Sequence, residues 1–575
     1  MKKFYSLIFI VFVLLNYACG QSKTEKIEAL INMYAEFGLF NGSVLVAEKG
    51  NIIYKTGKGW ANVEWEIPNQ PDTKHRLASI TKQFTAMLIV QLASENKLKL
   101  DVPISSYLPD YPKKTGDIIT IHHLLTHTSG IPNYTSFPNY REIMQDPKSA
   151  EELVSLFADS TLEFTPGNRF QYSNSGYVLL GYIIEKITGL PYEQVLQNKI
   201  FTPLKMNNSG YDHNDVVIKK RASGYDQVGN TFQHTNYIDM SVPYSAGGIY
   251  STVEDLYLWD QALYTEKLVP QKYRDLLFGS HIPAGQQFYG YGWEMGKMPV
   301  GSSDDVVQII SHSGSINGFG TLITRIPSDK SSIILLNNAG GAPLYDITIG
   351  ITGILQDKPY SLPKKSLAFS LLEMIEKDGV RPPLVNLKEI KDSGDYTINE
   401  NEMNVAGYQL LHSSPSEAAF IFKMNVEAFP NSFNTYDSYG EALLILGDTT
   451  QAIENYTKSV KLNPGNENGL KVLKELGVNT DTLIKKVSIE DLKLLEGDYI
   501  ITNPPTDGDK YWKIEFEEVS GVLVGNDRGY RYKLVPVRDN QFINPDDGAS
   551  LIFDTKDKNA ITLMLFGRFK FRKEI

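Results

Sequence analysis

The stretch RLASITKQFTAM, residues 76–87, places Ser79 and Lys82 three positions apart at the start of a predicted apolar helix. Residues at this spacing share one face of a helix, so the Lys82 amine can reach back to the Ser79 hydroxyl. A serine hydroxyl is a weak nucleophile until a base removes its proton, and a neutral amine is a competent base. The stretch therefore indicates a serine that is activated by a neighbouring lysine.

Lys82 can act as a base only where its pKa falls below the value of about 10.4 that is usual for a free lysine. Burial at the start of a helix, where the dipole is positive, shifts the pKa in that direction. Taken alone, however, the S-x-x-K pattern arises by chance in a chain of this size. A capping serine beside a solvated lysine is the ordinary interpretation, so the pair needs support from other segments.

A second motif lies in FQYSNSGYVLLGYIIEKITG, residues 170–189, where Tyr172 and Asn174 flank Ser173 just ahead of an amphipathic pattern. A tyrosine at the tip of a loop can relay a proton, and an asparagine amide can hold a substrate carbonyl. The segment therefore supplies a candidate acid–base group and a candidate substrate contact.

A third motif lies in IISHSGSINGFGTLI, residues 309–323, with His312, Ser313 and Gly314 at the end of an apolar predicted strand. Gly314 has no side chain and lets a substrate backbone approach the strand edge closely. His312 is able to donate a hydrogen bond or to exchange a proton with a nearby base. This edge is therefore expected to bind the substrate.

The three motifs, in this order, resemble those of the serine β-lactamases, the penicillin-binding peptidases and related esterases. The likeness is greatest to the class C and D-aminopeptidase-like branch, in which Tyr replaces the first Ser of an S-x-N element. Further matching stretches are LLTHTSGIP at 124–132, FTPGNRFQYSN at 164–174 and AGGIYSTVEDLYLW at 246–259. The likeness extends over about residues 25–355, and three ordered motifs in such a context are specific.

The resemblance implies a role for each matching residue. Ser79 would be the nucleophile that forms an acyl-enzyme, Lys82 would take its proton, and Tyr172 would share the acid and base roles toward the leaving group. Asn174 would orient the substrate and help to set the charge of Lys82. The amide N–H groups of Ser79 and Ser315 would form the oxyanion hole, where such donors are each worth about 3–4 kcal/mol of barrier. No metal or organic cofactor is implied.

One position departs from the family pattern. The third motif of β-lactamases and cell-wall peptidases begins with lysine, whereas here it begins with His312, a side chain that ordinarily titrates near neutrality. The loss of a permanent cation that grips a substrate carboxylate argues against efficient β-lactam hydrolysis. Esters, amides and D-amino-acid peptides are therefore the expected substrates.

These residues predict an exported serine hydrolase that acts on a small molecule or peptide through a Ser79 acyl-enzyme. Two alternatives stay open, namely a penicillin-binding-type cell-wall peptidase and a non-catalytic cell-wall or peptide-binding sensor that uses the same site. The sensor is less favoured because a pure binding protein has no need of a complete set of catalytic residues. A lasting adduct with a penicillin would indicate a sensor or peptidase, and turnover without an adduct would indicate a hydrolase.

A cluster of histidines in IHHLLTHTSG invites a zinc interpretation, because His123 and His127 lie one helical turn apart and His122 is adjacent. The spacing lacks the glutamate of the H-E-x-x-H signature, and no third ligand is evident. The same stretch is part of the family likeness, so structural histidines are expected here.

The composition describes an ordinary globular protein and excludes one class of partner. The 575 residues are 42% hydrophobic and 21% charged, which predicts two to four domains. The net charge of −11 and the isoelectric point of about 5.5 give no electrostatic basis for binding nucleic acid.

The amino terminus, MKKFYSLIFIVFVLLNYACGQSK, has two lysines, an apolar stretch and then small residues, which predicts a signal peptide over residues 1–20. Cleavage before Cys19 would leave a lipid-anchored protein, whereas cleavage after ACG would release a soluble one. Asn16 occupies a position that is usually aliphatic in lipoprotein signals. We expect export to the periplasm or outer surface, with membrane contact only through a possible lipid anchor. Because Cys19 is the only cysteine, internal disulfides and cysteine metal sites are excluded.

Strand-like runs stand at both ends of residues 23–356, with helical patterns between them. The first runs lie in GSVLVAEKGNIIYKTGKG, and the last are VVQIISHSG, GTLITRIP and SSIILLNN. This arrangement predicts an α+β hydrolase domain in which an antiparallel sheet is built from distant segments and flanked by helices, with a helical subdomain.

Three further regions follow the hydrolase domain. Residues 357–400 are expected to be a linker, and residues 487–575, with short strands between Gly, Asn and Asp turns, an antiparallel barrel or sandwich. Residues 401–480 resemble tetratricopeptide repeats, with two unrelated helical hairpins as the alternative. The matches at a period of 34 are Ala418 with Ala452, Phe422 with Tyr456, Val426 with Val460, and Pro430 with Pro464. We expect these regions to bind a protein partner or mediate self-association.

Overall fold

The computed structural model describes residues 21–228, 231–378, 387–483, 487–504, 512–527, 530–538, 540–545, 548–558 and 560–574. Contacts divide the chain into two compact units, Met1–Pro363 and Lys364–Ile575, which are described one at a time. The predicted signal peptide, with Cys19, lies outside the described residues. Within those ranges no helix is both long enough and apolar enough to cross a bilayer.

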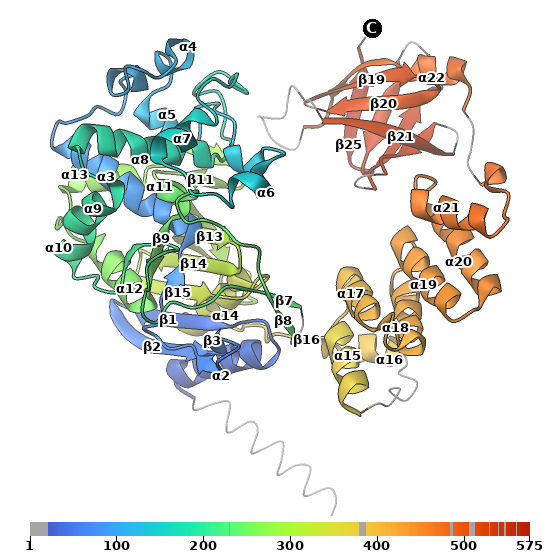
Figure 1. Ribbon diagram of the computed structural model, residues 1–575, viewed down its shortest axis with the longest axis horizontal. Coiled ribbons are helices and arrows are strands. Elements are labelled where there is room, and N and C mark those ends of the chain that lie inside the picture. Colours follow the sequence, from blue (N-terminus) through green and yellow to red (C-terminus); the bar gives the residue numbers. More distant parts are fainter. Residues whose placement is uncertain are drawn as a thin grey trace, which may run out of the picture. The chain divides into compact units, whose positions relative to one another are not determined.

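An eight-stranded antiparallel sheet forms the centre of the first unit (Figure 1). Its order is β10-β11-β12-β13-β14-β15-β1-β2. Strands from the two ends of the unit lie side by side, since Val46 of β1 pairs with Ile333 of β15. The α+β plan predicted from the sequence is therefore confirmed. The strands are β1 (Gly42–Glu48), β2 (Asn51–Lys58), β10 (Ile282–Ala284), β11 (Gln287–Tyr289), β12 (Glu294–Pro299), β13 (Val306–Ile316), β14 (Phe319–Ile326) and β15 (Ser331–Asn337).

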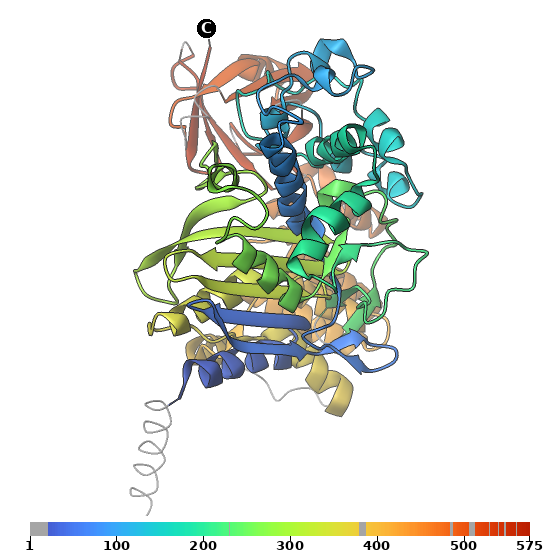
Figure 2. The same cartoon turned by 90° about the vertical axis from the view of Figure 1, so that its left-hand side faces the viewer.

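Helices cover both faces of this sheet. The helices α2 (Lys23–Glu36) and α14 (Leu344–Leu355) pack on one face, and α2 is the blue helix below the sheet in Figures 1 and 2. The helical subdomain packs on the other face. Because β15 is covered on both sides, every one of its residues is buried, and its sequence reads as a continuous apolar run instead of an alternating one.

The helix α3 (Thr81–Ser94) runs through the middle of the helical subdomain. Its residues from Thr81 to Ala93 are all buried, which explains why the segment is apolar on every side. The surrounding helices are α5 (Ile121–Leu125), α7 (Ala150–Ser155), α8 (Asn174–Thr188), α9 (Tyr192–Leu196), α11 (Tyr244–Gly247), α12 (Val253–Ala262) and α13 (Gln271–Leu277). A small sheet of β5 (His75–Arg76), β9 (Ile249–Ser251) and β6 (Gly210–Tyr211) leads into α3.

The second unit begins earlier than the sequence suggests. Residues 357–400 were expected to be a linker, yet they contain β16 (Lys365–Ser366), α15 (Leu367–Asp378), α16 (Leu387–Ser393) and β17 (Tyr396–Thr397). Apolar residues of these helices join one core with α17 and α18, namely Leu367, Leu371, Leu387 and Ile390. The helical spacing of the leucines therefore outweighs the prolines and lysines that suggested a linker.

Antiparallel helices follow, and Ala418 and Ala452 lie fully buried at matching positions of α18 and α20. Phe422 and Tyr456, one turn further on, are buried as well. The tetratricopeptide assignment stays a prediction. The helices are α17 (Glu400–Leu410), α18 (Pro415–Ala428), α19 (Phe433–Ile445), α20 (Thr449–Leu462) and α21 (Glu467–Glu475).

The chain ends in a closed antiparallel barrel, which resolves the predicted choice between a barrel and a sandwich. Aromatic and aliphatic side chains fill its interior, including Tyr499, Phe516, Phe553 and Phe571. The helix α22 (Ile489–Leu495) leads into its strands, which are β18 (Gly497–Ile501), β19 (Lys513–Val519), β20 (Val522–Asp527), β21 (Tyr530–Arg538), β22 (Gln541–Ile543), β23 (Ser550–Asp554), β24 (Thr562–Leu565) and β25 (Phe569–Lys573).

Candidate active site

Two strands fix the turn that carries Ser79. This residue lies in the 3-10 turn η1 (Ala78–Ile80), directly before α3. The Leu77 N–H donates to the carbonyl of Ile249 on β9 at 2.8 Å. From the other side, the Thr321 hydroxyl of β14 donates to the Leu77 carbonyl, also at 2.8 Å. The backbone beside Ser79 is therefore held between the small sheet and the large one, and the Ser79 side chain stays partly exposed.

The Lys82 amine has three oxygen neighbours. Its Nζ lies 3.1 Å from Ser79 Oγ, 2.8 Å from Asn174 Oδ1 and 2.9 Å from the Ala246 carbonyl oxygen. Two of these, the Asn174 and Ala246 oxygens, can only accept a hydrogen bond. A neutral amine has two N–H groups to donate to them, and its lone pair is then directed at the Ser79 hydroxyl. The geometry is that of a base placed against a nucleophile.

The surroundings of Lys82 favour this neutral form. Its side chain is fully buried, and burial lowers the pKa of Lys82 well below its ordinary value. In the described part of the chain no carboxylate lies within ion-pair distance of its Nζ to oppose that shift. The rings of Tyr172 and Tyr177 are the nearest aromatic neighbours, with centroids 4.9 Å and 5.6 Å from Nζ. The lowered pKa agrees with what burial at the helix start predicted.

Tyr172 lies in the loop just before α8 and approaches Ser79. Burial raises the pKa of Tyr172, and its hydrogen bond with Ser79 acts in the opposite direction. The phenol therefore keeps its proton at neutral pH and is able to donate it. Its ring packs against the ring of His127 at a centroid distance of 4.3 Å.

The stretch LLTHTSGIP positions this second motif. The Ser173 N–H donates to Nδ1 of His127 at 3.1 Å, and the Asn174 N–H donates to the Asn133 side chain at 3.1 Å. Since Nδ1 of His127 accepts, its proton is on Nε2, which is buried among aromatic rings. His123 in turn caps α5 by accepting from the Thr120 N–H. These histidines have structural contacts, and no group of three or more possible ligands is placed to hold a metal in the ranges that the structure describes.

His312 does not behave as the sequence suggested. Burial, followed by the charge of Lys82, lowers the pKa of His312 to about 3, so the expected titration near neutrality is wrong. Both of its nitrogens are engaged, because Nδ1 donates to the Ser313 carbonyl at 2.6 Å and Nε2 accepts from the Tyr289 hydroxyl at 3.0 Å. The ring is neutral and packs 6.3 Å from that of Tyr172. It therefore offers the substrate no cation and instead supports the acid–base group.

Gly314 serves a different purpose from the one expected. A side-chain carbon at this position would lie 2.2 Å from the Leu77 carbonyl oxygen and 3.1 Å from the Ser79 nitrogen. Glycine is therefore required for β13 to approach the turn that carries Ser79, whereas the sequence suggested the approach of a substrate. The ladder between β12 and β13 ends at Ser311, so the β12-facing edge of β13 has no β12 partner from His312 onward. The predicted oxyanion donors, the N–H groups of Ser79 and Ser315, lie on either side of this contact.

A cleft of about 890 Å³ opens over Ser79. The structure brings Asn174, Ser313, Gly314 and Ser315 to its wall, while Lys82 is buried beside Ser79. Other residues of the wall include Tyr134, Thr135, Arg141, Asp226, Asn317 and Tyr345.

Two contributors to the site were missed from the sequence. The Ala246 carbonyl is a backbone group inside a quoted stretch, AGGIYS, but nothing in the letters shows that it faces Lys82. Tyr289 lies in QFYGYGW, residues 287–293, and is fully buried against His312 and His127. Its neighbours in sequence form no motif, so only the pairing of β11 with β12 could have found it.

The comparison with protein families decides the assignment. The family described as Beta-lactamase matches residues 29–348, more than half of the chain. The chain belongs to the β-lactamase family. Members of this family are generally serine hydrolases, among them amidases, penicillin-binding proteins and β-lactamases.

Individual relatives agree with this assignment. A penicillin-binding protein of Bacillus subtilis (strain 168) is 30% identical over 367 residues, which cover 60% of this chain and 79% of the relative. The structure of D-amino acid amidase from Ochrobactrum anthropi SV3 is 26% identical, covers 58% of this chain and 97% of its own, and has a TM-score of 0.51. An octameric penicillin-binding protein homologue from Pyrococcus abyssi covers 96% of this chain and 99% of its own at 24% identity and a TM-score of 0.51, which indicates a shared fold alone.

Proposed function

We propose that this member of the β-lactamase family hydrolyses an amide or ester through a covalent acyl-enzyme on Ser79. The observation that carries the proposal is the placement of the buried Lys82 amine. Its two N–H groups have acceptor-only partners in Asn174 and Ala246, and its remaining position faces the Ser79 hydroxyl at 3.1 Å. That arrangement supplies the proton acceptor that a serine nucleophile needs.

The reaction follows from these contacts. Lys82 takes the Ser79 proton as Oγ forms a bond to the substrate carbonyl carbon, and the N–H groups of Ser79 and Ser315 stabilise the oxyanion. Collapse breaks the bond to the leaving group, which receives the proton of Tyr172. The ammonium of Lys82, close to the Tyr172 ring, restores that proton. Water then attacks the acyl-enzyme by the same route in reverse, which releases the acid and regenerates Ser79.

The site favours esters, amides and D-amino-acid peptides over β-lactams. His312 stands where related enzymes carry lysine and is neutral, so no cation is offered there to a β-lactam carboxylate. The likeness to a D-amino acid amidase supports the same substrate class.

The test is hydrolysis of a short-chain nitrophenyl ester by the purified protein and by Ser79→Ala. We expect activity in the first and none above background in the second. Ser155→Ala, which alters an exposed serine of α7, is the matched control and should stay fully active. Full activity in Ser79→Ala would overturn the mechanism.

A second candidate is a penicillin-binding-type peptidase with slow deacylation, and the name of the Bacillus subtilis relative favours it. The intact mass of the protein after incubation with a penicillin distinguishes the two. A lasting adduct that is absent from Ser79→Ala would support the peptidase, and an unmodified protein with turnover would support the hydrolase.

We also propose that the protein acts outside the cytoplasm and self-associates. The amino-terminal sequence supports export, with or without a lipid on Cys19. The octameric state of the Pyrococcus abyssi homologue supports self-association. Mass spectrometry of the amino terminus after expression in a Gram-negative host tests the first, and light scattering of the full chain tests the second.

A further inference from the structure

A second cavity, of about 400 Å³, adjoins the cleft that holds Ser79. Thr235, Asn317 and Phe319 line both, so the two spaces share a wall. The second cavity is lined by two arginines, Arg76 and Arg221, and by a loop whose apolar tip is largely exposed. A cavity with cationic groups beside a catalytic serine is a candidate for holding part of the substrate.

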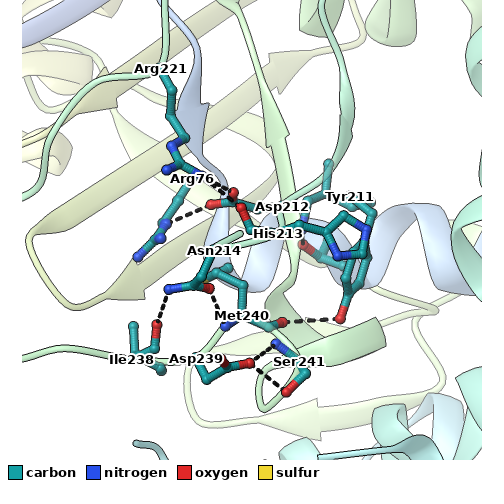
Figure 3. A network of polar contacts seen from close by, with 12 residues as sticks. Arg76, Tyr211, Asp212, His213, Asn214, Arg221, Ile238, Asp239, Met240 and Ser241 are labelled. Carbon is teal, nitrogen blue, oxygen red and sulfur yellow. Dashed lines mark hydrogen bonds and ion pairs between the residues drawn. The ribbon is translucent and has the colours of Figure 1, made fainter. Parts of the chain in front are cut away.

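The two arginines share one buried carboxylate (Figure 3). Nε of Arg76 donates to Asp212 at 2.7 Å, and Nη1 of Arg221 donates to the other oxygen of Asp212 at 2.5 Å. Nη1 of Arg221 also donates to the His213 carbonyl at 3.0 Å. Asp212 is fully buried. One carboxylate balances only one guanidinium, so the cluster has one positive charge more than it needs for its own neutrality.

Hydrogen-bond donors are also in surplus. Each guanidinium has five N–H groups, and the bonds made within the described residues use only Nε of Arg76 and Nη1 of Arg221. In Figure 3 the terminal nitrogens of Arg76 point away from Asp212. They are held in place, because Arg76 belongs to β5, its guanidinium lies 5.8 Å from the Phe319 ring centre, and its side chain is only 14% exposed. A rigid, partly desolvated fork of this kind fits a carboxylate.

The other charged group that lines the cavity is Asp215, which is exposed at the rim. In the described part of the chain it makes no ion pair with Arg76 or Arg221. It therefore reduces the positive potential at the entrance without occupying the donors inside.

The position of the cavity tells which end of the substrate reaches it. Tyr172, which protonates the leaving group in the proposed reaction, lies beside His312, before the oxyanion position on β13. Asn317 and Phe319 lie past Ser315, in the opposite direction along the chain. The leaving group therefore lies toward His312, and the acyl group extends toward the second cavity.

We infer that Arg76 and Arg221 bind a carboxylate carried at the far end of the acyl group, which makes the substrate an ester or amide of an acidic acyl unit. The inference rests on the proposed function and adds the charge of the substrate to it. Arg76 and Arg221 are then specificity-determining residues that do not touch the reacting atoms.

The test compares nitrophenyl esters of dicarboxylic acids, from succinate to suberate, with neutral esters of equal chain length. We expect kcat/KM to favour the charged ester by about tenfold or more at one chain length, since the cavity lies at a fixed distance from Ser79. A ratio near one at every length would overturn the inference while leaving the proposed hydrolase intact. Failure to hydrolyse either ester would count against the proposed function itself.

Variants assign the effect to the cavity. Arg76→Lys and Arg221→Lys keep a cation near Asp212 but remove the planar fork, so the ratio of charged to neutral ester should fall toward one. Asp215→Asn should raise the ratio. Lys220→Gln, which removes an exposed charge paired with Asp72 and outside the cavity lining, is the control and should leave the ratio unchanged. Because each ratio is measured on one preparation, partial unfolding cancels.

A binding measurement separates the cavity from turnover. Calorimetry with monomethyl glutarate and Ser79→Ala protein should detect binding that Arg76→Lys in the same background weakens by about tenfold. Equal binding, or none, in both proteins would contradict the inference, whatever the esters show.

Discussion

Two fully buried cations in the first unit, Lys82 and Arg325, have opposite surroundings. Arg325 of β14 donates to the buried carboxylate of Asp260 at 2.6 Å, and aromatic rings enclose its guanidinium. Lys82 has only neutral oxygens as partners. A counter-charge keeps a buried cation charged and makes it structural, whereas neutral partners let burial remove the proton and leave a base. The partner, more than the depth of burial, decides the chemistry.

The largest effect should come from removing the base. In Lys82→Met we expect the turnover of a nitrophenyl ester to fall by about 10²–10⁴-fold, because general base catalysis is lost. The same variant should be more stable than the wild type, and increasingly so as the pH falls. The pKa of Lys82 is lowered in the folded protein, so the wild type must give up a proton on folding that the unfolded chain holds. Lower stability of Lys82→Met at pH 6 in urea unfolding would contradict this.

Removing the structural cation should affect stability instead. Arg325→Met leaves the Asp260 carboxylate buried without its partner, and the free energy of unfolding should fall by about 3–5 kcal/mol. The double variant Arg325→Met/Asp260→Leu is the matched control and should recover most of the loss, because an apolar pair replaces an ion pair at little cost. Urea unfolding measures both, and an unaltered single variant would refute the assignment.

The comparison is sharpened by His312, a third buried group near Lys82. Activity should be lost as the pH falls through the Lys82 pKa, because the base must be neutral. The pKa of His312 is about 3, so His312→Gln should leave the position of this acid limb in kcat/KM unchanged. Disappearance of a limb between about pH 6 and 7 in the variant would show that the histidine titrates there in the wild type.

The smallest effect is expected from the second unit. A chain that ends at Pro363, the boundary between the units, should hydrolyse a small ester within about twofold of the full-length rate. The catalytic groups named above all lie before that boundary. Circular dichroism must first show that the shorter protein is folded, and loss of turnover in a folded sample would reveal a contribution from the helices or the barrel.

Much of the site could be predicted from the sequence because its groups lie in short, ordered motifs. Ser79 and Lys82 are placed together by helical spacing alone, and the returning strands predicted the sheet that carries Gly314. The charge state of His312 could not be predicted, because it depends on Tyr289 and on burial by segments that share no motif with it. The helices in residues 357–400 were missed because local prolines and lysines obscured the spacing of the leucines.

By itself, the sequence determined which groups are able to react and in what order they occur, since periodicity and motif spacing are local properties of the chain. Only the tertiary structure decided their protonation and partners. The oxygens that complete the Lys82 site come from residues 92 and 164 positions away, and Arg76 meets Asp212 across 136 positions. Burial and the pairing of charges are set by such distant contacts, and they turn an ordinary lysine into a base and two ordinary arginines into a candidate carboxylate site.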